Sequence, residues 1–260
     1  MANWRTPFNG CPLCEGNGTI YLEADCSQHA LYKKPLPQTI TWLRCDQCGH
    51  IYTSGYFTKA ALELVFSDAH ANQTPGVNVE QDRFTWADVV ASVSSIRKSY
   101  EGRWLDVGFG SGNLLLTAME FGYEALGIDL RESSVNSLRT FGLQVSCSDL
   151  LDLEVDSPVD VISMADVLEH MPFPKPALQR AHEILGPNGT LFLSMPNIDA
   201  PLWKILDLNS QNPYWGELEH YHNFGRVRLI KLLEEHGFKF VHYNVSKRYR
   251  SCMEVIATKI

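Results

Sequence analysis

The sequence predicts an α/β fold with a doubly wound, mostly parallel sheet of seven strands and a small cysteine-rich module at the N-terminus. Short β-rich runs alternate with helical segments from about residue 101 to residue 260. A glycine-rich loop follows the first of these runs, and two Cys-x-x-Cys pairs lie within residues 1–58. Strands that alternate with helices of this length form a parallel sheet with helices on both faces.

The elements follow from apolar runs and from the glycines that end the helices. Runs of apolar residues predict five strands, at residues 103–107, 123–128, 143–146, 159–164 and 190–195. Helical periodicity predicts helices at residues 113–121, 132–141, 176–185 and 226–236. Residues 238–245 and 252–258 predict a final antiparallel pair. The stretch 186–189, Gly-Pro-Asn-Gly, predicts the end of the third helix.

Composition and charge exclude several classes of protein. Hydrophobic residues make up 45% of the 260 residues and charged residues 20%, which predicts a packed core rather than global disorder. We find no run of about 18 apolar residues and no signal peptide, and we expect a cytoplasmic protein. The net charge is -8, and the only basic bias lies in residues 226–260, which argues against broad binding to nucleic acid.

The glycine loop runs from Asp106 to Gly112, just after a predicted strand and at the start of a predicted helix. Glycines let a ligand approach the backbone, and a helix N-terminus offers free N–H groups. A dinucleotide fingerprint has its third glycine at the sixth position, but Asn113 stands there and Gly112 comes one residue early. The acidic residue before the loop favours a cationic amino-acid ligand over a pyrophosphate.

Two further carboxylates follow neighbouring strands. Asp129 ends the second predicted strand, where a carboxylate can accept both hydroxyls of a ribose, and Asp149 follows the third. With Asp106, they predict a ligand-binding shelf at the carboxyl edge of the sheet. A tight turn without a ligand is the alternative for the glycine loop, and a helix cap is the alternative for Asp149.

Four motifs in this order resemble a class I methyltransferase that depends on S-adenosylmethionine (SAM). They are Leu-Asp-Val-Gly-Phe-Gly-Ser-Gly at 105–112, Gly-Ile-Asp-Leu at 127–130, Ser-Asp at 148–149, and residues 160–170, which end in Leu-Glu-His. The last motif is typical of the ubiquinone-biosynthesis-like branch. The resemblance covers about residues 100–245 and implies a Rossmann-like methyltransferase fold with SAM as cofactor.

The resemblance also implies roles for individual residues. Asp106 and the glycines would hold the methionine end of SAM, Asp129 the ribose, Asp149 and Leu150 the adenine, and Ala165 would line the sulfonium. The implied cofactor-binding set is Asp106, Gly108, Phe109, Gly110, Gly112, Asp129, Leu130, Asp149, Leu150 and Ala165. Relatives often carry cysteine where this chain has Phe109, but the backbone does the binding there.

The cysteine pairs, Cys11/Cys14 and Cys45/Cys48, predict a closed structural zinc site because two Cys-x-x-Cys turns bring four thiolates into a tetrahedron. The alternatives are a redox pair or four unbound thiols. Cys26, His29 and His50 are nearby and could substitute as ligands, although their spacing is less regular. Because the module is small, metal binding would supply much of its folding energy. We expect a structural or substrate-covering role for it.

Candidate catalytic residues lie in two segments. His170 follows the fourth predicted strand, and its alternative role is a hydrogen bond to the backbone at a helix start. Residues 219–224 resemble the Glu-His-x-x-x-Phe segment of sugar and small-molecule methyltransferases with similar zinc modules. This resemblance implies His220 as a general base that Glu219 orients, and a structural loop is the alternative.

Together these features predict three regions: a zinc-binding module at 1–58, a helical connector and cofactor lid at 59–100, interrupted by a polar stretch at 70–78, and a SAM-dependent methyltransferase domain at 101–260. The expected reaction is O- or C-methylation of a small molecule, such as a sugar, a lipid-linked compound or a specialised metabolite. The alternatives are an RNA or protein methyltransferase that grips its polymer with the zinc module, and a SAM-binding scaffold without catalysis.

Overall fold

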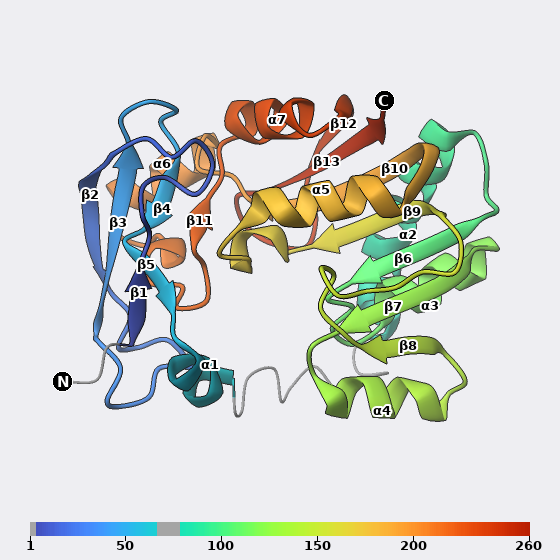
Figure 1. Cartoon of the computed structure of the whole chain (residues 1–260), viewed down its shortest axis with the longest axis horizontal. Coiled ribbons are helices and arrows are strands. Elements are labelled where there is room, and N and C mark those ends of the chain that lie inside the picture. Colours follow the sequence, from blue (N-terminus) through green and yellow to red (C-terminus); the bar gives the residue numbers. More distant parts are fainter. Residues whose placement is uncertain (1–3, 67–78) are drawn as a thin grey trace. The chain divides into compact units, whose positions relative to one another are not determined.

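The computed structural model describes residues 4–66 and 79–260 (Figure 1). The chain divides into two compact units, which are described separately below. Among the described residues, the cysteine unit contains residues 4–66, 169–175 and 196–232, and the sheet unit contains residues 79–168, 176–195 and 233–260. The domain boundaries inferred from the sequence stay a prediction.

The sheet unit is built on a seven-stranded sheet in the order β12-β13-β10-β9-β6-β7-β8. Its strands are β6 (Arg103–Val107), β7 (Glu124–Asp129), β8 (Gln144–Cys147), β9 (Val159–Ala165), β10 (Leu185–Pro196), β12 (Phe238–Val245) and β13 (Cys252–Lys259). The pairs β10–β9, β9–β6, β6–β7 and β7–β8 are parallel, and β12 runs antiparallel to β13. The predicted fold class, a Rossmann-like methyltransferase sheet, is confirmed.

Helices cover this sheet on both faces (Figure 1). They are α2 (Val79–Arg97), α3 (Asn113–Phe121), α4 (Glu132–Thr140) and α5 (Pro174–Ile184). The ends of α3 agree with the sequence-based prediction because glycines in the left-handed conformation, Gly112 and Gly122, bound it on both sides. The predicted interruption at 70–78 lies outside the described residues.

The core of the sheet unit centres on Trp104, which is fully buried on β6. Its indole Nε1–H donates a hydrogen bond of 2.8 Å to the Ser163 hydroxyl on β9, so the only polar atom of the ring is satisfied. Val161 and Phe192 belong to the same buried cluster. A parallel sheet buried on both faces explains why the runs around these residues are almost continuously apolar.

One boundary differs from the prediction. Residues 186–189 were expected to separate a helix from a strand that begins at residue 190, but they lie inside β10. Leu185 already pairs with Val159, and the register with β9 shifts between Leu185 and Thr190. Asn188 takes a positive φ of 58° within this irregularity. Turn-forming residues therefore make a bulge here, because the ladder with β9 holds the chain on both sides of it.

The cysteine unit contains a four-stranded sheet in the order β11-β4-β3-β2 and a two-stranded sheet of β1 and β5. Its strands are β1 (Arg5–Pro7), β2 (Gly18–Asp25), β3 (Thr39–Cys45), β4 (Ile51–Thr53), β5 (Gly55–Phe57) and β11 (His222–Asn223). The helical elements of this part of the chain are α1 (Lys59–Phe66), η1 (Leu168–His170), α6 (Pro201–Leu208), η2 (Pro213–Trp215) and α7 (Arg226–Glu235), with Leu168 and the last residues of α7 assigned to the sheet unit.

The long segment at 196–216, which follows the fifth strand of the large sheet in sequence, supplies aromatic side chains to the core of the cysteine unit. Trp203 is 1% exposed and stacks on Tyr214, with ring centroids 5.0 Å apart. Trp42 on β3 donates its Nε1–H to the carbonyl of Trp215 at 2.9 Å. Because these contacts join distant segments of the chain, the cysteine unit includes far more of the sequence than the cysteine pairs alone.

No helix within the described ranges is both long enough and apolar enough to cross a lipid bilayer. The cytoplasmic location expected from the sequence stays a prediction.

Candidate functional site

The glycine loop between β6 and α3 has a backbone that side chains would disturb. Gly108, Gly110 and Gly112 have φ values of 68°, 60° and 80°. A Cβ at Gly108 would lie 2.8 Å from Val167 Cγ2. Gly112 is the N-cap of α3 and makes no side-chain capping bond, so the first N–H groups of this helix have no capping side chain. The loop is a suitable cradle for a ligand that binds to backbone groups.

Asp106 lies on β6 directly before this loop and is 2% exposed. The Ser163 hydroxyl donates a hydrogen bond of 2.6 Å to its Oδ1. Burial raises the pKa of Asp106 to about 7, although the hydrogen bond from Ser163 and the charge of Arg248 oppose this change. A buried carboxyl with few donors is a natural partner for a cationic ligand group, because a cation would stabilise its charged form.

Asp129 ends β7 and faces the same loop. Its Oδ2 accepts a hydrogen bond from the N–H of Gly110 at 3.1 Å, and its Oδ1 accepts one from the N–H of Arg131 at 2.9 Å. The guanidinium of Arg131 also binds both oxygens, at 3.0 and 2.9 Å. The side chain is 7% exposed, so this carboxylate is held in a fixed position beside the glycine loop.

The other predicted cofactor residues have different surroundings. Leu130 is 72% exposed, directly after Asp129, while Phe109 and Leu150 are buried. Ala165, the last residue of β9, is partly buried. Asp149 is exposed, and its Oδ1 accepts the N–H of Leu151 at 2.9 Å within a turn. The described residues between β8 and β9 include no helix, so Asp149 is not the helix cap named as the alternative.

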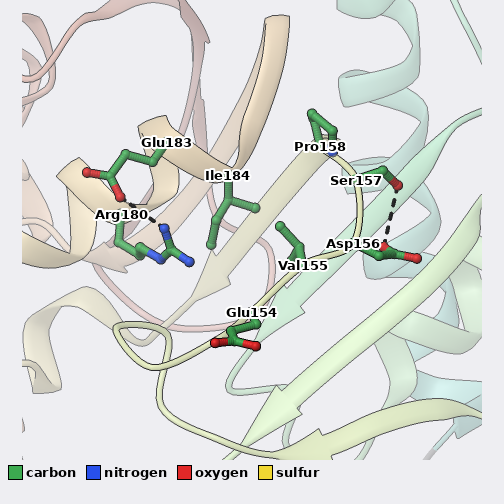
Figure 2. A pocket seen from close by; sticks show the side chains of 8 residues that line it. All are labelled: Glu154, Val155, Asp156, Ser157, Pro158, Arg180, Glu183 and Ile184. Carbon is green, nitrogen blue, oxygen red and sulfur yellow. Dashed lines mark hydrogen bonds and ion pairs between the residues drawn. The ribbon is translucent and has the colours of Figure 1, made fainter.

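A surface pocket of about 460 Å³ lies at the other end of β9 (Figure 2). It is lined by Glu154, Val155, Asp156, Ser157, Pro158, Arg180, Glu183 and Ile184. The pocket borders the residues that enter β9, whereas Ala165 ends the strand about 20 Å away at the usual rise per residue. It is therefore separate from the glycine loop and the carboxylates.

The four cysteines of the predicted metal site come together in the cysteine unit. One Sγ atom from each lies within 4.8 Å of the others. The Sγ atoms of Cys11 and Cys48 are 3.7 Å apart, and those of Cys14 and Cys45 are 3.4 Å apart. Zinc–sulfur bonds of about 2.3 Å in a tetrahedron would place the sulfur atoms about 3.8 Å apart, so the cluster has the size of a zinc site.

The surroundings of one cysteine, Cys45, favour a thiolate, whereas burial raises the pKa of Cys11 and Cys48. The N–H of Cys48 points at the Sγ of Cys45, at 3.4 Å. Burial alone would raise the pKa of Cys45, but hydrogen bonds from the backbone of Cys48 and Gln47 lower it to about 7. Gly49 takes a φ of 71°, which lets the second Cys-x-x-Cys turn close.

The three residues named as possible substitute ligands have other partners. The thiol of Cys26 donates to the carbonyl of Gln38 at 3.2 Å, and His29 pairs with Glu217 at 3.0 Å. The Nε2 of His50 lies 3.0 Å from the Nδ1 of His222, a pair of buried imidazoles that the sequence analysis did not foresee. The Nε2 of His222 is 3.0 Å from the carbonyl of Met171, so it is the donor of that bond and Nδ1 accepts from His50.

The candidate catalytic histidines also meet in the cysteine unit. The rings of His170 and His220 are 4.7 Å apart in an edge-to-face arrangement. The Nδ1 of His170 lies 3.3 Å from the carbonyl oxygen of Glu219, so the predicted segments are in contact. His220 is 7% exposed, and burial lowers its pKa well below the usual value, which keeps its imidazole neutral.

Glu169 is a further residue of this histidine cluster and is 1% exposed. Ligand atoms of Glu169, His170 and His220 lie within 4.8 Å of one another, an arrangement that could hold a metal ion. The Leu-Glu-His motif was visible in the sequence, but nothing in the spacing of 169 and 220 indicated that they meet. Glu219, predicted to orient His220, is also buried, at 7% exposure.

A family model described as "Methyltransferase domain" matches residues 79–243. The chain belongs to this family. The protein is therefore a SAM-dependent methyltransferase, as the glycine loop, the two buried carboxylates and the order of the strands had indicated.

The methyltransferase is similar to curated proteins named ubiquinone biosynthesis O-methyltransferase. The one from Colwellia psychrerythraea is 28% identical over 172 residues, which are 60% of this chain and 70% of that protein. The one from Acinetobacter baylyi is 26% identical over 208 residues, which are 73% of this chain and 85% of that protein.

Two solved structures share the fold. The 1,6-didemethyltoxoflavin-N1-methyltransferase of Burkholderia thailandensis, with 1,6-didemethyltoxoflavin and S-adenosylhomocysteine (SAH) bound, has a TM-score of 0.61 at 18% identity, and the match covers 85% of this chain and 95% of that chain. The magnesium protoporphyrin IX methyltransferase of Synechocystis, with bound SAH, has a TM-score of 0.56 at 18% identity and covers 68% of this chain and 83% of its own.

The raised pKa of Asp106 predicts a dependence of stability on pH. Its carboxyl titrates near pH 7 in the folded protein and near pH 4 when unfolded. Its neutral form is therefore favoured by folding, and its contribution to stability is lost as the pH rises from about 4 to about 7. We expect the free energy of unfolding of the wild type to fall, relative to that of Asp106→Asn, by up to about 1.4 kcal/mol per unit of pKa difference.

Chemical denaturation of both proteins without cofactor, at several values between pH 5 and pH 8, measures this difference. If the free energies of unfolding of the two proteins changed equally with pH, the raised pKa of Asp106 would be contradicted.

Proposed function

We propose that this methyltransferase transfers a methyl group from SAM to an oxygen or carbon atom of a small-molecule acceptor, such as a sugar, a lipid-linked compound or a specialised metabolite. The observation that carries the proposal is the position of Asp106, the glycine loop and Asp129 beside one another at the carboxyl edge of the sheet. The similarity to ubiquinone biosynthesis O-methyltransferases supports an oxygen acceptor.

The residues at this edge fit the parts of SAM. The buried carboxyl of Asp106 suits the ammonium group of the methionine moiety, and the glycine loop offers backbone groups to the main chain of the ligand. Asp129 would offer its two carboxylate oxygens to the ribose hydroxyls in place of the hydrogen bonds that they accept from the side chain of Arg131 in the structure. The exposed side chain of Leu130 offers an apolar surface to the adenine, and we assign Asp149 and Leu150 to the same group. When bound, SAM supplies an electrophilic methyl group on its sulfonium.

Substitution of Asp129 tests the cofactor site. We expect micromolar binding of SAH to the wild type and a loss of about tenfold or more in Asp129→Ala, because the ribose loses two charge-assisted hydrogen bonds. Isothermal titration measures both. Asp156→Ala is the matched control, since Asp156 is an exposed carboxylate that binds Arg103 before β9 begins. If SAH did not bind to folded wild-type protein, the proposal would be contradicted. The alternative of a SAM-binding scaffold without catalysis would be contradicted too.

The proposed base is His220. A general base must be neutral before it accepts a proton, and burial keeps the imidazole of His220 in that form at neutral pH. The ring of His170 packs against it in an edge-to-face arrangement, and the ring of Tyr214 is stacked with it at a centroid distance of 6.5 Å. These contacts restrict the orientation of the ring. Glu219 and His170 are the proposed orienting residues.

Removal of the base should slow methyl transfer without weakening cofactor binding. With an acceptor found by following SAH formation across phenols, catechols and sugars, we expect His220→Asn to lower kcat by about a hundredfold or more, while the SAH dissociation constant changes by less than about twofold. His242→Asn, on the exposed face of β12, is the control. Unchanged turnover in both His220→Asn and His170→Ala would show that neither histidine is the base.

The second part of the proposal is a structural zinc ion held by Cys11, Cys14, Cys45 and Cys48. The sulfur separations and the N–H group directed at Cys45 support it. Such an ion would fix the turn between β3 and β4. Because β4 pairs with β11, in which His222 lies opposite Tyr52, the ion would stabilise the strand that follows His220 in the sequence. This is a structural role for the module rather than a grip on a polymer.

Metal analysis tests the zinc site. We expect about one zinc per chain in the wild type and in Cys147→Ser, whose cysteine is exposed and lies outside the cluster, but a large loss in Cys45→Ser. Because ligand binding to the folded state raises stability, the melting temperature should fall with the zinc content. Equal zinc content in the three proteins, measured by mass spectrometry, would exclude the four-cysteine site.

A further inference from the structure

Arg248, in the turn between β12 and β13, is a buried arginine at the same edge of the sheet as the glycine loop. Its side chain is 10% exposed, and its Nη1 donates a hydrogen bond of 2.8 Å to Oδ2 of Asp166, the residue that follows β9. Its Nη2 donates to the Ser194 hydroxyl on β10. The Nε atom is buried and is the one nitrogen of the guanidinium without a hydrogen-bond partner among the described residues.

The helix α2 places this guanidinium close to the methionine end of the cofactor site. The Arg248 guanidinium carbon lies 4.1 Å above the ring of Trp86 on α2. One helical turn earlier, Asp82 accepts a hydrogen bond of 2.8 Å from the side chain of Asn113, the first residue of α3. Residues four apart share a face of a helix and lie about 6 Å apart along it. The contact of α2 with Asn113, directly after the glycine loop, and its contact with Arg248 are therefore about one helical turn apart along α2.

A cation at this place would complement the charges of the cofactor. The methionine end of SAM carries an ammonium and a carboxylate on the same carbon atom, whereas the glycine loop is bordered by the carboxyls of Asp82, Asp106 and Asp129. Of the two arginines that the hydrogen bonds above place at this edge, Arg131 is bound to Asp129 on the ribose side. Arg248 is the other, and its positive charge lowers the pKa of Asp106.

We propose that Arg248 binds the carboxylate of the methionine moiety of SAM, with its planar guanidinium held in place by Asp166, Ser194 and Trp86. These contacts orient the group before the cofactor arrives. A guanidinium has five donors, of which Asp166 and Ser194 use one each, so Nε–H and a second N–H of the group can bind a carboxylate while the ion pair is kept. This role concerns cofactor binding and does not depend on the identity of the acceptor.

The test compares SAH with S-adenosyl-3-thiopropylamine, which lacks only the carboxylate, by isothermal titration of the full chain. We expect the wild type to bind SAH more tightly by about tenfold to a hundredfold, and Arg248→Gln to remove this preference by weakening SAH alone. Arg248→Lys, which keeps the charge but not the fork of donors, should show an intermediate preference. Lys247→Gln is the matched control, because it removes a charge from the same turn, where Lys247 pairs with Asp88 at an exposed site.

Three results would overturn the inference. Arg248→Gln could weaken both ligands equally, which would show that the residue only supports the fold. SAH affinity could be unchanged in Arg248→Gln, which would exclude the cofactor as the ligand of Arg248 and indicate an anionic group of the acceptor instead. The wild type could also bind both ligands equally, which would show that no cation of the protein binds the carboxylate of SAH. If Arg248→Gln does not fold, the wild type and Arg248→Lys decide among these results.

Discussion

The parallel pairing of β6 with β7 on one side and β9 on the other is the constraint on which the cofactor site depends. In this register Asp106 lies between Gly127 and Ser163. Ser163 donates to the carboxyl of Asp106 on one side. On the other side, a Cβ at Gly127 would lie 2.6 Å from a methyl carbon of Leu115, so a larger residue would displace this side chain of α3. Because parallel strands end at the same edge, the pairing of β6 with β7 also places Asp129, at the end of β7, beside the glycine loop.

The central carboxyl is costly to bury, and the structure offsets this cost only in part. Its raised pKa shows that one hydrogen bond and the charge of Arg248 do not fully replace the water that Asp106 loses on folding. A site that is incomplete without a cation is suited to bind one. The partly buried ion pair of Arg248 with Asp166 leaves a positively charged group with unused donors, because the Nε of Arg248 has no hydrogen-bond partner among the described residues. The two groups together match a ligand that carries both charges.

The cysteine unit combines two functions of the chain that look unrelated in the sequence. The strand β11 extends the sheet that begins with the cysteine turns, and His222 on this strand binds His50, two residues after Cys48. Two positions earlier in the sequence, His220 packs against His170. The four-cysteine cluster and the proposed base therefore lie beside strands of one small sheet, and the aromatic contacts of Trp42 and Trp203 belong to the core of the same unit.

The sequence by itself determined the large sheet, the glycine loop and the set of four cysteines, because these depend on patterns within short segments. Apolar runs, glycine stops and two Cys-x-x-Cys turns each need only a few neighbouring residues. The tertiary structure alone decided that residues 186–189 form a bulge, that β11 joins the cysteine unit, and that Arg248 reaches Asp166. Each of these depends on a partner far away in the chain, and no local pattern encodes which partner that is. The same reason explains why Glu169 was missed, since its place beside His220 follows from the folding of both segments around one core.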